Sequence, residues 1–142
     1  LYRSADYEEL AIADYLPLLV DEISSIFDPA SLVKFEFNIE DFVISSKILS
    51  CLGIIINELI TNSMKYAFRD RAYGVIHISA LKKADEVTLI YKDNGVGLPE
   101  SQGFKKSAGF GMQLVDMLVK QIGGTAEINR DNGTGFIIRF KV

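Results

Sequence analysis

The sequence predicts a two-layer α/β sandwich, in which helices cover one face of a mixed, mostly antiparallel sheet. Two kinds of apolar pattern lead to this class. Some segments repeat with the 3.6-residue period of an amphipathic helix, and others alternate at every second residue, as strands do. The expected order is helix, strand, long helix, hairpin, glycine-rich loop, helix and hairpin. Strands that arrive mostly as hairpins, with helices enough for one face, favour this architecture.

The first two helices have recognisable beginnings. Asp14 can cap the first helix, and Pro17 then falls in its first turn, where proline is tolerated. Ser45 or Ser46 opens the second helix, whose apolar positions keep the helical period to about Phe68. This long helix also carries polar residues on a face that is offset from its apolar stripe.

The strands are recognised by alternation between apolar and polar residues. A polar turn at residues 83–85 joins one hairpin, and a turn at residues 131–134 joins the last one. A short extended piece is expected at residues 42–44. The full strands are expected at residues 32–39, 75–82, 86–92, 125–130 and 136–142.

Residues 93–111 show neither pattern and are rich in glycine. A structureless stretch of this length inside a compact domain is usually functional. The third helix follows from about Met112 to Ile122. It is expected to end at Gly123 and Gly124, because glycine adopts the left-handed conformation that commonly closes a helix.

Size and composition are those of a globular domain that can bury a core of its own. Of the 142 residues, 49% are apolar and 24% are charged, and the net charge of −4 argues against a nucleic-acid partner. A nucleotide ligand is still compatible, because a local pocket can be positive on an acidic protein. Residues 1–10 are expected to be a linker from an upstream segment and residues 11–142 one domain, in a cytoplasmic setting.

Three polar side chains on the long helix are candidates for joint chemistry. Glu58, Asn62 and Lys65 are spaced i, i+4 and i+7, so a regular helix places them on one face. A carboxylate, an amide oxygen and an ammonium group in line can activate a proton, bind a hard cation and contact a phosphate. Mg²⁺ suits such a set because it keeps several waters and needs one or two protein ligands. An ordinary solvated helix face is the alternative interpretation.

Two glycine motifs flank the loop. Asp93 ends a strand and precedes Gly95 and Gly97. Its carboxylate can accept a hydrogen bond from an exocyclic amine, while the glycines allow close approach of the backbone. Gly109 and Gly111 stand before the third helix, whose free N–H groups would form a phosphate cradle. Taken singly, the motifs are also compatible with an ordinary turn and with a loop that enters a helix.

In this order the motifs resemble those of the superfamily shared by gyrase, heat-shock chaperones, histidine kinases and mismatch-repair ATPases. Residues 57–68 look like the N box, 93–97 like the first glycine box and 109–114 like the second. Residues 133–136 are similar to the closing Gly-Thr turn. The N box and the short segment 98–108 resemble histidine kinases most, and the opening residues are similar to the linker found in the subclass related to the HWE kinases. The resemblance implies a Bergerat-type ATP-binding fold.

Carried over by position, the resemblance implies a site for ATP and Mg²⁺. Asn62 would hold Mg²⁺, and Glu58 is the candidate catalytic base. Asp93 would accept the adenine amine, with support from Thr134. Contacts to phosphate or ribose and the lining of the nucleotide pocket fall to Lys65, Gly95, Gly97, Lys105, Gly109, Gly111 and Met112.

The resemblance also implies a histidine protein kinase of a two-component system. It would donate the γ-phosphoryl group of ATP to a histidine on an upstream dimerisation domain and signal to a response regulator. The only histidine, His77, lies in an expected strand, so this chain is expected to lack the acceptor. The full-length protein, soluble or membrane-anchored, would be a homodimer and this fragment a monomer. An anti-sigma type serine protein kinase and a non-catalytic nucleotide-binding module remain alternatives.

Overall fold

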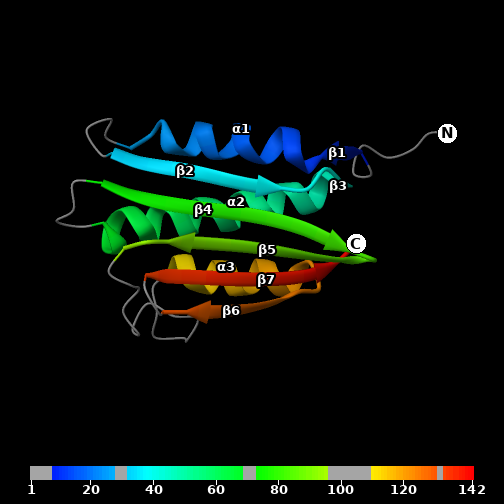
Figure 1. The fold of residues 1–142 in the computed structure, drawn as a ribbon. Coiled ribbons are helices and arrows are strands. Elements are labelled where there is room, and N and C mark those ends of the chain that lie inside the picture. Colours follow the sequence, from blue (N-terminus) through cyan, green and yellow to red (C-terminus); the bar gives the residue numbers. More distant parts are fainter. Residues whose placement is uncertain (1–7, 28–31, 69–72, 96–109, 131–132) are drawn as a thin grey trace.

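One layer of the molecule, within the residues that the structure describes, is a five-stranded mixed sheet of order β2–β4–β5–β7–β6 (Figure 1). The structure is a computed structural model and describes residues 8–27, 32–68, 73–95, 110–130 and 133–142. β2 runs parallel to β4, and the other neighbouring strands pair antiparallel. The strands are β2 (Leu32–Ile39), β4 (Tyr73–Lys83), β5 (Glu86–Asp93), β6 (Thr125–Asn129) and β7 (Thr134–Lys141).

The helices form the second layer. They are α1 (Ile12–Ser24), α2 (Ser46–Asn62) and α3 (Phe110–Gln121). In Figure 1 the sheet lies in front of α2 and α3, while α1 runs beside β2 and packs against α2. This arrangement confirms the predicted two-layer α/β sandwich with helices on one face. Within the described residues, no helix is long and apolar enough to cross a membrane.

A small second sheet is not foreseen by the sequence pattern. β1 (Glu9–Ala11) pairs antiparallel with β3 (Val43–Ser45), which overlaps the extended piece expected at residues 42–44 and is shifted from it by one residue. Strands of three residues are too short for alternation to identify them. β1 crosses the boundary expected between residues 10 and 11, and the division into linker and domain stays a prediction.

Apolar side chains at alternate strand positions join the two layers. Ile76, Leu89 and Phe136 point from neighbouring strands into the core, where they are at most 2% exposed and share one cluster with Ile55 and Leu59 of α2. Each such side chain contributes roughly 1.5–3 kcal/mol when fully removed from water. Polar groups at the ends of these strands are therefore held by a close-packed support.

The start of α1 differs from the prediction. The helix begins at Ile12, with Ala11 in the capping position, and Asp14 lies in its first turn and caps nothing. The Ile12 N–H donates to the Phe42 carbonyl at 3.0 Å, so a tertiary contact satisfies the end of the helix. The prediction that Pro17 falls in the first turn is consequently wrong, since it lies inside the helix.

The start of α2 is confirmed. The Ser45 side chain caps the helix by accepting a hydrogen bond from the Ile48 N–H at 3.2 Å. Its far end is different from the expected regular helix, because residues Ser63–Ala67 form a π-helical segment. There the Phe68 N–H donates to the Ser63 carbonyl, five residues back, at 3.1 Å.

The end of α3 is also confirmed. Gly123 has a φ of 75°, and its N–H donates to the Lys120 carbonyl at 2.9 Å. The Gly124 N–H donates to the Val119 carbonyl at 2.8 Å. These two bonds are the Schellman arrangement, which requires a residue that tolerates positive φ at the first glycine.

The cap of α2 can be tested by one substitution. Ser45→Ala removes the acceptor for the Ile48 N–H and should lower the free energy of unfolding by about 1 kcal/mol. Ser50→Ala, on the exposed side of the same helix, is the matched control and should raise it by a few tenths, because alanine is the better helix former. Urea denaturation of both variants measures the two changes. Equal effects would contradict the capping role.

Candidate functional site

The candidate site lies where the end of β5 and the start of β7 meet α2. Asp93 is the last residue of β5 and Thr134 the first of β7, and the two are directly paired across the strands. Both are 2% exposed, and with Ser63 they are the buried polar residues among those that the structure describes. The predicted pair Asp93 and Thr134 is thus brought together, in a buried position.

The Asp93 carboxylate accepts three hydrogen bonds. Oδ1 accepts from the backbone N–H of Gly95 at 3.0 Å and from that of Thr134 at 3.1 Å. Oδ2 accepts from the Ser63 hydroxyl at 2.7 Å. A carboxylate offers about four lone-pair positions, so one position on Oδ2 is left for a further donor.

The sequence interpretation missed two residues of this network, Ser63 and Tyr91. Their hydroxyl groups lie 2.7 Å apart, and the Tyr91 hydroxyl also donates to the Leu59 carbonyl at 3.2 Å. Burial raises the pKa of Tyr91 well above its usual value of 10.0, and the nearby Asp93 charge adds to this despite an opposing hydrogen bond with Ser63. Tyr91 therefore remains protonated and able to donate. Its position two residues before Asp93 on the same strand is the signal that could have found it.

Beside Asp93 lies a narrow cavity between packed side chains, which is too small in this structure to hold a water molecule. The Thr134 Oγ1 atom is buried and, among the described residues, has no hydrogen-bond partner. Leaving a buried hydroxyl without a partner costs about 1–3 kcal/mol, so this atom calls for a hydrogen-bonding partner that the described residues do not supply. The cavity is lined by Leu59, Asn62, Ser63, Ala67, Asp93, Thr134 and Phe136.

α2 and α3 meet beside this cavity through predicted site residues. The Asn62 side-chain amide donates to the Met112 sulfur at 2.8 Å. A Cβ atom on Gly111 would lie 2.5 Å from the Glu58 Oε2 atom, so the missing side chain lets this carboxylate approach α3. Gly111 lies within the first turn of α3, whereas the sequence places it before the helix. Glu58, Asn62, Gly111 and Met112 are thus neighbours.

Lys65 does not share the regular helix face that its spacing suggested. It lies in the π-helical segment and is exposed, whereas Glu58 and Asn62 are half-buried. The wider turn of a π-helix changes the direction of the residues that follow its start, so the assumption of one regular helix to Phe68 is wrong. Gly97, Lys105 and Gly109, and with them Lys106, lie outside the described residues.

Two glycines permit the close contacts around Asp93. A Cβ atom on Gly95 would lie 2.3 Å from the Ala67 Cβ and 2.5 Å from the Ala67 carbonyl oxygen. Gly133 has a φ of 104°, and a Cβ atom there would lie 2.2 Å from the Asp93 carbonyl oxygen. The absence of a side chain at Gly95 therefore lets the chain after β5 pack directly against the π-helical segment.

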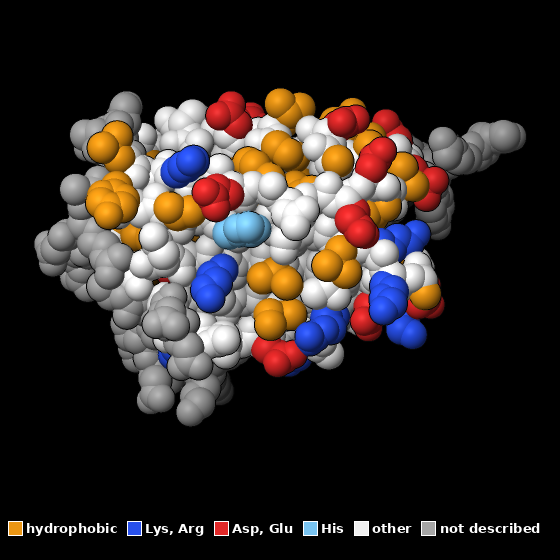
Figure 2. All heavy atoms as spheres, in the orientation of Figure 1, with side chains coloured by type: hydrophobic (Ala, Val, Ile, Leu, Met, Phe, Trp, Pro, Cys, Tyr) orange, Lys and Arg blue, Asp and Glu red, His pale blue; other side chains and the backbone are white. Residues whose placement is uncertain are grey.

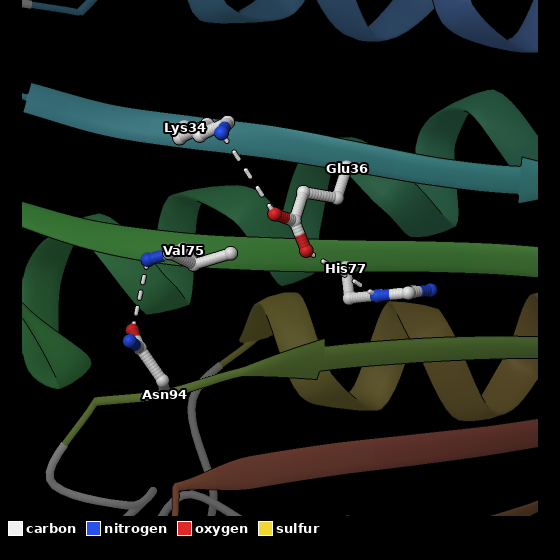
Figure 3. Close-up of polar contacts among 5 residues, drawn as sticks. All are labelled: Lys34, Glu36, Val75, His77 and Asn94. Carbon is white, nitrogen blue, oxygen red and sulfur yellow. Dashed lines mark hydrogen bonds and ion pairs between the residues drawn. The ribbon is translucent and has the colours of Figure 1, made fainter.

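Asn94 extends the pairing of β5 beyond its last residue. Its side-chain oxygen accepts from the Val75 N–H at 2.8 Å, as Figure 3 shows, and its own N–H donates to the Val75 carbonyl at 3.1 Å. These bonds replace the strand ladder where the chain leaves the sheet. They hold the segment from Asp93 to Gly95 in register with β4.

His77 lies on the other face of the sheet. Asp93 pairs with Ile76, whereas His77 pairs with Lys92, so alternation directs His77 away from the cavity. Its Nδ1 lies 3.7 Å from a Glu36 oxygen on β2, and its side chain is 47% exposed. Figure 2 shows His77 on the face that α2 and α3 leave uncovered, and Figure 3 shows it beside Glu36. His77 thus lies in a strand, as the sequence predicts, and its side chain is at the surface.

Comparison with known families decides the identity of the fold. Residues 50–142 match the model of the histidine kinase-, DNA gyrase B- and HSP90-like ATPase family. The chain belongs to this family. The match contains Asn62, Asp93 and Thr134, so the resemblance seen in the sequence motifs is confirmed.

Histidine kinases are among the relatives of this family member. The chain is 25% identical over 134 residues to blue-light-activated histidine kinase 2 of Erythrobacter litoralis, covering 94% of this chain and 38% of the relative. It is 31% identical over 104 residues to sensor histidine kinase PdtaS of Mycobacterium tuberculosis, covering 70% of this chain and 21% of the relative. The chain thus spans well under half the length of these relatives.

Solved histidine kinase domains share the fold. The histidine kinase domain of the E. litoralis EL346 blue-light-activated histidine kinase superposes with a TM-score of 0.83 and 22% identity, covering 98% of this chain and 69% of that one. The ATP-binding domain of PrrB from M. tuberculosis superposes with a TM-score of 0.73 and 23% identity, covering 96% of this chain and 97% of that one. At these identities the likeness shows the fold alone.

The close contact at Gly95 provides a test of the site's framework. Gly95→Ala places a methyl group against the Ala67 backbone and should lower the free energy of unfolding by roughly 3 kcal/mol. Gly135→Ala is the matched control, because a Cβ atom there would lie an ordinary 3.7 Å from its nearest neighbours. It should raise the free energy of unfolding by about 0.5 kcal/mol, since alanine restricts the unfolded chain more than glycine does. Urea denaturation compares the two variants. A neutral Gly95→Ala would show that the contact is easily relieved.

Proposed function

We propose that this chain is the ATP-binding catalytic domain of a sensor histidine kinase. It would transfer the γ-phosphoryl group of ATP to a histidine on a separate dimerisation domain. The observation that carries this proposal is the pairing of Asp93 and Thr134 at a buried cavity in a family of ATPases. One lone-pair position on Asp93 Oδ2 and the unpartnered Thr134 hydroxyl both lie there.

The polar groups of the cavity suit the adenine base. A buried carboxylate selects a ligand that donates a hydrogen bond, because Asp93 can only accept. The exocyclic amine of adenine is such a donor, and the Thr134 hydroxyl can serve a ring nitrogen directly or through a water. The apolar side chains of Leu59, Ala67 and Phe136 would contact a purine ring, and the cavity would have to widen to admit it.

The residues beside the cavity suit a nucleotide with Mg²⁺. The described residues contain no cluster of three or more His, Cys, Asp or Glu side chains that would hold a metal by themselves. Mg²⁺ needs no such cluster, since one or two protein oxygens and the phosphates suffice. The Asn62 amide nitrogen faces Met112, so its oxygen is the atom that would hold the ion. When bound, Mg²⁺ would neutralise charge on the phosphate oxygens.

Phosphoryl transfer requires positioning and charge stabilisation more than covalent chemistry from the protein. The first turn of α3, which contains Gly111 and Met112, offers backbone N–H groups for phosphate oxygens. Glu58 lies against that turn and is the candidate base, and Lys65 is a candidate for phosphate or ribose contact. Gly97, Lys105 and Gly109 are proposed to complete the pocket from the loop.

The location of His77 supports an acceptor other than His77 itself. A nucleotide bound at Asp93 would lie on the helix side of the sheet, and His77 faces the other side. The acceptor would thus be a histidine on the dimerisation domain of the same kinase, and a response regulator would act downstream. We propose a cytoplasmic location for this domain.

Calorimetry can test the assigned roles in ATP binding. Asp93→Ala should weaken ATP binding at least about a hundred-fold, because it removes the acceptor for the amine and leaves buried donors unpaired. Asn62→Ala should remove the gain in ATP affinity that Mg²⁺ gives. His77→Gln, on the opposite face, is the control and should bind as the unaltered chain does. Unchanged isotherms for Asp93→Ala and Asn62→Ala, in folded protein, would refute the assignment.

The acceptor assignment has its own test. The purified chain, incubated with γ-labelled ATP and Mg²⁺, should acquire little or no acid-labile label, because His77 faces away from the site. Rapid labelling that disappears in His77→Gln would show that the acceptor is already in this chain. Acid-stable label on serine would instead favour a serine protein kinase.

A further inference from the structure

We infer that Tyr91 and Ser63 form a positioning relay that fixes Asp93 as the acceptor for the 6-amino group of a purine. The relay thereby determines how strongly the site prefers adenine to a purine without that group. This inference rests on the proposed function, because it concerns the same base-binding cavity. It assigns specificity to two hydroxyl groups behind the residue that would touch the base.

Ser63 departs from the usual behaviour of a hydroxyl residue in a helix. Serine and threonine there commonly donate to the carbonyl four residues earlier. Thr61 does so, since its hydroxyl donates to the Asn57 carbonyl at 2.8 Å. The equivalent acceptor for Ser63 is the Leu59 carbonyl, yet the Ser63 hydroxyl donates to Asp93 Oδ2 at 2.7 Å.

Tyr91 accounts for this difference. Its hydroxyl donates a hydrogen bond to the Leu59 carbonyl at 3.2 Å, the acceptor that Ser63 would otherwise use. The same hydroxyl lies 2.7 Å from the Ser63 oxygen. The Ser63 hydroxyl has one proton, and the Asp93 carboxylate can only accept it. The Tyr91 proton is accordingly shared between Leu59 and Ser63, and Tyr91 directs Ser63 away from its own helix and toward Asp93.

The relay fixes the orientation of the Asp93 carboxylate from its far side. The backbone N–H groups of Gly95 and Thr134 hold Oδ1, and Ser63 holds Oδ2, so rotation of the carboxylate breaks bonds on both oxygens. The remaining position on Oδ2 then points in one direction. A purine amine in that direction gains a charge-assisted hydrogen bond, and a purine without the amine gains nothing from the orientation.

A pair of nucleotides that differ only in the amine can isolate this effect. The probes are ATP and purine riboside triphosphate, which lacks the 6-amino group, and calorimetry with the intact chain gives both affinities. Ser63→Ala should weaken ATP binding about ten-fold and change binding of the second probe less than about two-fold. The preference for ATP would thus shrink about ten-fold.

Tyr91→Phe supplies an independent variant that keeps the ring. It should reduce the same preference by a smaller factor, because Ser63 could then turn to the Leu59 carbonyl. The double variant should be no worse than Ser63→Ala alone, since Tyr91 acts through Ser63. Thr61→Val is the matched control: it removes a helical hydroxyl that does not reach Asp93 and should leave the preference unchanged.

The outcomes separate this inference from the proposed function. If Ser63→Ala and Tyr91→Phe weaken the binding of both nucleotides equally, the two hydroxyl groups have a merely structural role. If neither variant changes the preference for ATP, they have no role in it. Either result overturns the relay, while the proposal that the chain binds ATP stands. If the unaltered chain binds neither nucleotide, the proposed function fails and the relay fails with it. Circular dichroism confirms that each variant is folded before its affinities are compared.

Discussion

The burial of the Asp93 carboxylate is the constraint to which the surrounding structure conforms. A buried carboxylate is costly unless hydrogen bonds replace its water. Its donors come from the chain after β5, from the start of β7 and from the π-helical segment, at Gly95, Thr134 and Ser63. The strand pairing and the approach of α2 to the sheet thus converge on one side chain, and the fold and the candidate site share the same bonds.

Irregular backbone makes this convergence possible. The π-helical segment follows α2 at the point where Ser63 meets Asp93, and π-helical turns occur frequently at functional sites. Gly95 lies against the end of that segment, and Gly133 uses a positive φ beside the Asp93 carbonyl. Each of these features lowers local regularity, but together they allow three chain segments to approach more closely than ordinary side chains permit.

The two faces of the sheet carry different polar groups. The helix-covered face holds the buried polar network, with Asp93, Ser63 and Tyr91 in contact. The uncovered face carries His77 beside Glu36 in an exposed position. Ile76 pairs with Asp93 and points into the core, and His77 is the next residue along β4. Because successive residues of a strand point to opposite faces, His77 points away from the cavity. The proposed transfer to a histidine on another domain agrees with this separation.

Local pattern in the sequence determined most of the helices and strands of the two layers and the identity of the motif residues. The strand at 32–39, the Ser45 cap and the stop at Gly123 depend on nearest neighbours along the chain, and they agree with the structure. Tertiary structure alone decided the start of α1, where Phe42 satisfies Ile12. It also decided the partnership of Ser63 with Tyr91 and Asp93, because the direction of a hydroxyl is set by groups about 30 residues away that folding brings within hydrogen-bond distance.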